Sequence, residues 1–215
     1  MFEIIPGILE KNWEEIEKKI EIVKPFAKSI HIDIIDGKFA PNTTFLDPTP
    51  FAKYSQDILF ELHMMVKNPI QYLKPFADAG FRRFLGHIEK MPDQREFVAK
   101  AAKLGEVGLA IDGPTDLSRI KIPYEQLDSV LVMAIKAGWS GQKFNPEYLK
   151  KVEIIHSVQE GINIEVDGGI NDRTILLAKN EGANKFVSTS FIFGVHPSVG
   201  RPQSQFNLLR TIAEK

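Results

Sequence analysis

The feature that most limits the possible folds is a regular alternation of short apolar runs and amphipathic stretches along the whole chain. In the amphipathic stretches apolar residues return every three or four positions, which is typical of helices packed on one face. Such stretches include Trp13–Ile20, Ile70–Ala77 and Glu147–Val152. The eight apolar runs predict β-strands at Glu3–Leu9, Ser29–Asp36, Phe60–Val66, Arg83–Glu89, Gly105–Ile111, Ser129–Ala134, Asn163–Asp167 and Lys185–Thr189.

This alternation favours an α/β fold with a parallel sheet. Eight strand–helix units in 215 residues leave roughly 27 residues per unit, near the compact end for a (β/α)8 TIM barrel. A doubly wound open sheet is the alternative, and periodicity alone does not exclude it; the count of eight favours the barrel. No linker or change of composition interrupts the pattern, so we expect residues 1–215 to form a single TIM-barrel domain.

Composition narrows the classes of partner. The 27 basic and 28 acidic residues leave a net charge of −1, and the chain has no cysteine. Near-neutral charge argues against nucleic acid or an anionic membrane as the main partner. The lack of cysteine excludes disulfides, iron–sulfur clusters and thiol nucleophiles. Without a basic, apolar leader or about 18 consecutive apolar residues, we expect a cytoplasmic protein that acts on a small molecule.

Polar side chains gather where predicted strands end. His31 and Asp33 are two residues apart in the second strand and therefore share one face, whereas Ile32 and Ile34 point to the helical layer. A hydrogen-bonded His–Asp pair without function would explain these two residues equally well. His63 ends the third strand and Asp167 the seventh. Two imidazoles and two carboxylates suit Zn²⁺, Mn²⁺ or Fe²⁺.

The positions of the two aspartates suggest a reaction. The second and seventh strands are three steps apart in a ring of eight, so Asp33 and Asp167 would face each other across the barrel mouth. A sugar lying between them would lose a proton to one carboxylate and regain one from the other on the opposite face. A metal ion would stabilise the enediolate formed in between, and the product would be an epimer.

Three further strand ends suit an anion. Glycine-rich turns present backbone N–H groups to phosphate, and barrels often bind phosphate after the seventh and eighth strands, although such glycines often only form the turn. The stretches contain Gly138, Trp139, Ser140 and Gly141, then Gly168 and Gly169, and finally Thr189 and Ser190. His87 and Glu89 share a face on the fourth strand, and they would line the substrate, support the metal ligands or serve structure alone.

Taken in order, these motifs resemble the ribulose-phosphate 3-epimerase family, which includes allulose-6-phosphate 3-epimerases, over nearly the whole chain. The motifs are His31–Gly37 with Phe39–Asn42, His63–Val66 with Pro69, His87–Glu89, Val132–Met133, Gly138–Phe144, Glu165–Gly169 and Ser190–Gly194. The resemblance implies a TIM barrel and one divalent metal ion held by His31, Asp33, His63 and Asp167. It also implies acid–base roles for the two aspartates and a homo-oligomeric assembly.

The same resemblance implies substrate contacts from His63, Gly138, Trp139, Ser140, Gly141, Gly168, Gly169, Thr189 and Ser190. The chain departs from the family pattern at positions that touch substrate. Gly7 replaces a serine, Ile35 a methionine and Ser140 a glycine, while the family's Gly-Ser after the eighth strand reads Thr189-Ser190. These departures leave the metal ligands intact and bear on the identity of the sugar.

The leading hypothesis is a metal-dependent 3-epimerase that interconverts D-ribulose 5-phosphate and D-xylulose 5-phosphate. A second keeps the chemistry but changes the sugar to allulose 6-phosphate or another ketose phosphate. A third is a non-catalytic phosphosugar-binding protein, which would have no reason to keep four metal ligands and both proton carriers.

Overall fold

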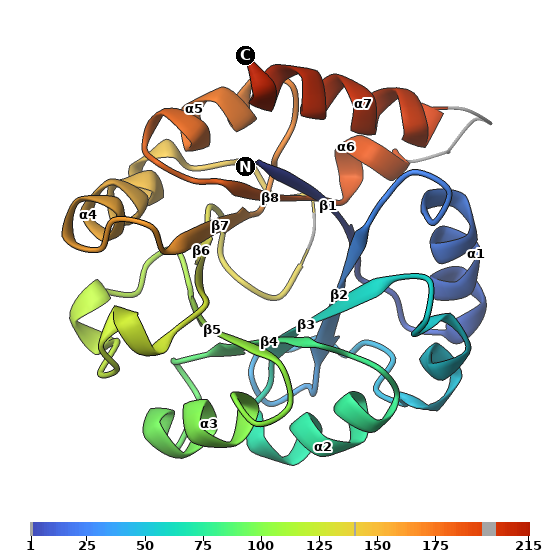
Figure 1. Cartoon of the computed structure of the whole chain (residues 1–215), viewed down its shortest axis with the longest axis horizontal. Helices are drawn as coiled ribbons and strands as arrows, with labels where there is room; N and C mark the ends of the chain where they lie inside the picture. Colours follow the sequence, from blue (N-terminus) through green and yellow to red (C-terminus); the bar gives the residue numbers. More distant parts are fainter. Residues whose placement is uncertain (1, 140, 195–200) are drawn as a thin grey trace.

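In the computed structural model, which describes residues 2–139, 141–194 and 201–215, eight parallel strands form a closed barrel surrounded by helices (Figure 1). Each strand pairs with the next, and β8 returns to pair with β1. The predicted barrel and the predicted strands are confirmed. The strands are β1 (Glu3–Ile8), β2 (Ser29–Ile35), β3 (Leu59–Met65), β4 (Arg83–His87), β5 (Glu106–Ile111), β6 (Ser129–Met133), β7 (Asn163–Asp167) and β8 (Lys185–Ser188).

The α-helices of the outer layer carry their apolar residues on the face toward the barrel. In α1, for example, Ile16, Ile20 and Val23 are buried, and the Asn12 side chain caps the first turn by accepting from the Glu15 amide. The helices are α1 (Trp13–Val23), α2 (Ile70–Asp78), α3 (Gln94–Ala101), α4 (Lys150–Val158), α5 (Thr174–Asn180), α6 (Ser190–Phe193) and α7 (Arg201–Glu214). None of these helices, within the described ranges, has the length and hydropathy needed to span a bilayer.

Two connections depart from the expected strand–helix repeat, and the one between β2 and β3 contains a 3₁₀-helix but no α-helix. Between β5 and β6 the chain forms two short 3₁₀-helices, η2 (Leu117–Arg119) and η3 (Tyr124–Gln126), in place of an α-helix. Pro114 and Pro123 lie in this segment, and each proline removes a backbone donor and disfavours a helical residue before it. Two further 3₁₀-helices, η1 (Thr49–Tyr54) and η4 (Pro146–Leu149), precede β3 and α4.

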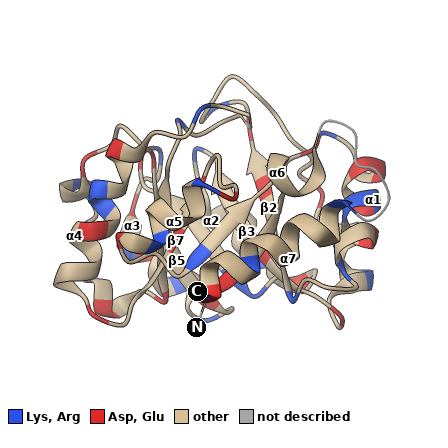
Figure 2. Ribbon diagram, turned by 90° about the horizontal axis from the view of Figure 1, so that it is seen from above, with Lys and Arg blue, Asp and Glu red and all other residues tan. Residues whose placement is uncertain are grey.

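The apolar core consists of two clusters, one on the outer face of the sheet and one on its inner face. The larger cluster lies between strands and helices and includes Ile32 and Ile34, as expected from their alternation with His31 and Asp33. The smaller cluster fills the barrel interior with Ile35, Met65, Leu85, Ala110, Leu131 and Met133, among others. Outside, acidic and basic residues are interspersed over the helices in the view of Figure 2. Polar side chains buried in the apolar interior near the strand ends therefore need hydrogen-bond partners or a bound ion.

Candidate active site

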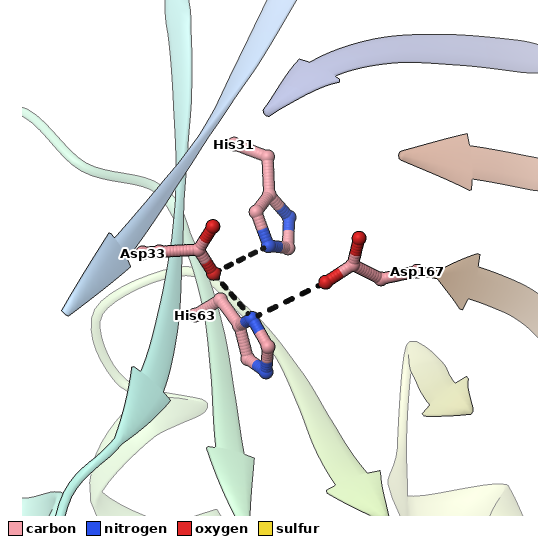
Figure 3. A group of neighbouring side chains, drawn as sticks. All are labelled: His31, Asp33, His63 and Asp167. Atoms are coloured by element: carbon pink, nitrogen blue, oxygen red, sulfur yellow. Dashed lines mark hydrogen bonds and ion pairs between the residues drawn. The ribbon is translucent and has the colours of Figure 1, made fainter. Parts of the chain in front are cut away.

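Two neighbouring strands present three polar side chains to the barrel interior. His31 and Asp33 lie on β2, and Asp33 is the direct Cα partner of His63 on β3. Asp167 ends β7 on the far side of the ring, so its carboxylate approaches the other three from the opposite wall (Figure 3). The period-2 alternation of the strands and the closure of the barrel bring the four predicted residues together.

The four side chains form one compact cluster. His63 Nδ1 lies 2.7 Å from Asp33 Oδ1 and 3.9 Å from Asp167 Oδ2, while His31 Nε2 lies 3.4 Å from Asp33 Oδ1 (Figure 3). One nitrogen or oxygen from each residue falls within 4.8 Å of the others. Asp167 is the most accessible of the four, with 13% of its side chain exposed. Two imidazole nitrogens and two carboxylate oxygens so arranged suit a divalent transition-metal ion.

His31 is held from below by carboxylates that the sequence interpretation missed. Its Nδ1 donates a hydrogen bond of 2.6 Å to Glu61 Oε1 and lies 3.3 Å from Glu165 Oε1. Its Nε2 is buried and has no hydrogen-bond partner among the described residues. With Nδ1–H bonded to a carboxylate, Nε2 offers its lone pair to a metal ion once it gives up its proton, which is the usual arrangement of a metal-binding histidine. This unpartnered nitrogen therefore fits a metal ion.

The two carboxylates below His31 differ in protonation. Burial raises the pKa of Glu165 to about 8, and the nearby Glu61 carboxylate adds to the effect. Burial acts against ionisation of Glu61 as well, but the hydrogen bond to His31 and the charge of Lys185 outweigh it and lower the pKa of Glu61 to about 2. Glu61 is thus the anion that pairs with His31, and Glu165 holds a proton near neutral pH.

His63 is supported through a second histidine. Its Nε2 lies 2.8 Å from His87 Nε2, and His87 Nδ1 lies 2.9 Å from Glu89 Oε2. Glu89 Oε1 in turn accepts the backbone N–H of Asp112 at 2.7 Å. With a metal ion on His63 Nδ1, the remaining hydrogens would run from His63 Nε2 to His87 and from His87 Nδ1 to Glu89. His87 therefore contacts the predicted ligand His63 on the side away from the cluster, and Glu89 contacts His87.

Asp33 and Asp167 lie in environments that shift their pKa values in opposite directions. Burial opposes ionisation of Asp33, but the His31 and His63 imidazoles outweigh it and hold the pKa of Asp33 well below its usual range. Burial raises the pKa of Asp167 to about 7, and the charge of Asp33 adds to this shift. Their surroundings therefore shift the pKa values of the two carboxylates in opposite directions, as is typical of acid–base pairs.

A cavity above this cluster is lined by both aspartates and by the predicted anion-binding turns. Its walls include Asp33, Asp167, Gly138, Trp139, Gly141, Gly168, Gly169, Thr189 and Ser190. His31 and His63 lie beneath it, fully buried, and the prediction for Ser140 falls outside the described residues. Apolar residues that the sequence interpretation did not assign to the site complete the wall, namely Leu9, Met65, Met133, Ile135, Ile170 and Val187.

The glycine turns at the cavity are closely packed. Gly168 has φ +108°, and a β-carbon there would lie 2.5 Å from Ile135 Cγ1, so only glycine fits without strain. The turn after β6 is tied to the loop after β2 because Asn42 Nδ2 donates to the Gly138 carbonyl at 3.1 Å. These contacts hold the loops of opposite strands around one opening.

Solved structures with a similar fold have low sequence identity to this chain. KGPDC from Streptococcus mutans superposes with a TM-score of 0.74 at 12% identity, covering 100% of this chain and 98% of that one. A 3-hexulose-6-phosphate synthase structure gives a TM-score of 0.69 at 17% identity, with coverage of 98% and 99%. At such identities the likeness supports the barrel fold alone.

Sequence comparison identifies the family. The model of the ribulose-phosphate 3 epimerase family matches residues 3–193. Ribulose-phosphate 3-epimerase from Schizosaccharomyces pombe is 33% identical over 88% of this chain and 86% of its own length. The cytoplasmic isoform from Oryza sativa subsp. japonica is 33% identical over 89% and 87%, and the Bacillus subtilis enzyme 30% over 90% and 93%. The chain therefore belongs to the ribulose-phosphate 3-epimerase family of isomerases.

Proposed function

We propose that this chain is a metal-dependent 3-epimerase that interconverts D-ribulose 5-phosphate and D-xylulose 5-phosphate. The observation that carries the proposal is the pair of aspartates on opposite walls of the barrel, with the pKa of Asp33 lowered and that of Asp167 raised, within a cluster of four side chains that suits a cation. An epimerase needs a base on one face of the reacting carbon and an acid on the other. Family membership supports the same reaction type.

The two aspartates divide the proton chemistry. The Asp33 carboxylate accepts the proton from C3 of the ketose, and the electron pair of the broken C–H bond passes into an enediolate. Asp167 then donates its proton to C3 from the opposite face, which inverts the stereocentre. In the reverse direction Asp167 is the base and Asp33 the acid, so each turnover exchanges their protonation states.

The metal site would consist of His31 Nε2, His63 Nδ1 and one carboxylate oxygen each from Asp33 and Asp167. The unpartnered Nε2 of His31 and the approach of all four donors to within 4.8 Å fit such an ion. A bound Zn²⁺, Mn²⁺ or Fe²⁺ would stabilise the negative charge that develops on neighbouring substrate oxygens. The protein's part is to fix these donors through Glu61 behind His31 and His87 behind His63.

The glycine turns would bind the phosphate group of the substrate. Gly138, Trp139, Gly141, Gly168, Gly169 and Ser190 line the cavity together with both aspartates. Backbone N–H groups in such turns suit phosphate oxygens, and barrels commonly bind phosphate after β7 and β8. A substrate anchored there would extend its carbon chain toward Asp33 and Asp167.

Proton NMR of D-ribulose 5-phosphate in D₂O, with metal-loaded protein, tests the proposal. The C3 proton signal should disappear while D-xylulose 5-phosphate accumulates, because a two-base epimerisation exchanges the proton with solvent. Addition of a chelator should stop the exchange, and addition of Zn²⁺, Mn²⁺ or Fe²⁺ should restore it.

The same experiment separates the alternatives. Exchange that is absent with D-ribulose 5-phosphate but present with D-allulose 6-phosphate would transfer the proposal to the hexulose phosphate. Binding of both sugars without any exchange would refute catalysis and favour a phosphosugar-binding protein. The expected homo-oligomer and the cytoplasmic location stay predictions, which light scattering after size-exclusion chromatography and cell fractionation check.

A further inference from the structure

Gly7 of β1 and Thr189 after β8 share one volume at the wall of the cavity. A β-carbon on Gly7 would lie 2.3 Å from Thr189 Oγ1 and 2.9 Å from Val187 Cγ1. Both distances are far shorter than any contact that a packed interior accepts. The threonine side chain therefore occupies the space that a side chain on Gly7 would need.

The position of Gly7 shows where the threonine hydroxyl points. Gly7 is the direct Cα partner of His31 on β2. Along β1, Ile4 and Ile8 pack into the outer apolar cluster, so Gly7 faces the barrel interior. Because Thr189 Oγ1 lies against this inner face of Gly7, it lies inside the barrel beside the residue that pairs with His31, and Thr189 lines the same cavity as Asp33 and Asp167.

The hydroxyl is held in place but has no protein partner. Thr189 precedes α6, yet its side chain makes no capping hydrogen bond to that helix. No hydrogen bond to Thr189 Oγ1 occurs among the described residues, and the residue is half-buried in the wall that also carries Asp33 and Asp167. A positioned hydroxyl that is free to donate and accept suits an oxygen of a bound sugar.

We propose that Gly7 and Thr189 act as a pair. Thr189, directly after β8, supplies a hydroxyl to a ketose oxygen near the reacting carbon, and Gly7 on β1 leaves room for the threonine side chain. Thr189 is thereby a specificity-determining residue, acting through its side chain on the sugar. This inference rests on the proposed 3-epimerase function. It also gives one physical reason for two departures from the family pattern, Gly7 for serine and Thr189 for glycine.

The first test removes the hydroxyl and keeps the shape. With D-ribulose 5-phosphate, Thr189→Val should lower kcat/KM about tenfold, the size expected for one lost hydrogen bond, whereas Thr189→Ser should stay within about twofold. The inhibition constant of inorganic phosphate should not change in Thr189→Val, because the hydroxyl contacts the sugar. Thr211→Val on the exposed side of α7 is the matched control.

Unchanged kcat/KM in Thr189→Val would overturn the inference, as would weaker inhibition by phosphate in proportion to the loss. Wild-type protein that exchanges no proton on either ketose phosphate would instead refute the proposed function itself, and this inference with it. An active wild type with a neutral Thr189→Val variant refutes the inference alone.

The second test exchanges the pair and has a readout independent of activity. Gly7→Ser alone should lower the melting temperature, because the new side chain overlaps Thr189. Adding Thr189→Gly should recover most of that loss and bring kcat/KM closer to wild type than either single variant. Losses in melting temperature that simply add in the double variant would show that the two positions are independent, and would overturn the pairing.

Discussion

Glu61→Gln tests whether the carboxylate beneath His31 supports metal binding. Glu61 is fully buried, and its Oε1 accepts the His31 Nδ1 hydrogen at 2.6 Å. The amide keeps the shape and an accepting oxygen but loses the negative charge. A hydrogen bond to a charged partner contributes about 1.5–3 kcal/mol and a neutral one about 0.5–1.5 kcal/mol. We expect metal affinity to fall by about 1–2 kcal/mol, roughly 5- to 30-fold.

Competition titration against a chromogenic chelator, with Zn²⁺ as the probe, measures this loss directly and needs no substrate. Glu106→Gln is the matched control, since Glu106 is 48% exposed and contacts Arg83 Nε at 2.7 Å. Both substitutions change an acidic partner of Arg83, whose Nη1 lies 3.9 Å from Glu61 Oε2. Circular dichroism of the metal-free proteins establishes that both variants are folded at the titration temperature.

Equal Zn²⁺ dissociation constants for folded Glu61→Gln, Glu106→Gln and wild-type protein would refute the reasoning. Such a result would mean that the cluster binds Zn²⁺ without help from the charge behind His31. A selective loss in Glu61→Gln would show that the barrel interior below the cavity contributes to the site.

Three further substitutions test other parts of the site. Asp167→Asn should reduce formation of D-xylulose 5-phosphate from D-ribulose 5-phosphate by about 10²- to 10⁴-fold in the NMR assay, because the amide cannot donate a proton to the opposite face of C3. Glu89→Gln should reduce the fall in unfolding free energy on acidification (the acid limb), measured by urea unfolding between pH 5 and pH 2. Gly168→Ala should cost about 2 kcal/mol or more of unfolding free energy, because strain at φ +108° adds to the clash with Ile135; Gly161→Ala, at φ +93° in open space, carries the strain alone.

The sign of the pH effect follows from the folded-state pKa of Glu89. Burial opposes its ionisation, but the hydrogen bond to His87 outweighs burial and lowers the pKa to about 2 from an ordinary 4.5. A lowered folded pKa stabilises the fold above pH 4.5, and that contribution, roughly 3 kcal/mol, disappears as the pH falls toward 2. An acid limb identical to wild type in Glu89→Gln, or an unaltered rate of D-xylulose 5-phosphate formation in Asp167→Asn, would contradict the corresponding prediction. Equal losses in the two glycine variants would contradict the clash with Ile135.

The sequence was sufficient to predict the barrel and the four side chains that cluster inside it, because each of the four lies in a local pattern. His31 and Asp33 are two apart on one strand, and His63 and Asp167 each end another. Parallel strands that close into a ring must bring such ends together. The second and fifth connections, which lack an α-helix, could not be predicted as irregular from the repeat alone, although the prolines in both were a usable signal.

The supporting groups were missed because they depend on the closed barrel. Glu61 and Glu165 stand two residues before His63 and Asp167 on the same inward face, so alternation was a signal for them. Whether an inward position is apolar or charged depends on its neighbours across the ring, which strand order and register decide. The contact between Gly7 and Thr189 likewise exists only because β8 closes onto β1.

The two histidines of the site are supported in different ways, and the difference matches their charges. His31 lies directly on a carboxylate, and although burial opposes its protonation, Asp33, Glu165 and Glu61 raise its pKa well above 6.5. On the side away from the cluster, His63 contacts His87 in place of a carboxylate, and burial lowers the pKa of His63 to about 4. A metal ion must therefore displace a proton from His31 but none from His63. Metal binding should therefore release protons at neutral pH. The Glu61→Gln variant should release fewer protons, because it lacks one of the carboxylates that raise the pKa of His31. Calorimetry repeated in buffers of different ionisation enthalpy measures the number of protons released.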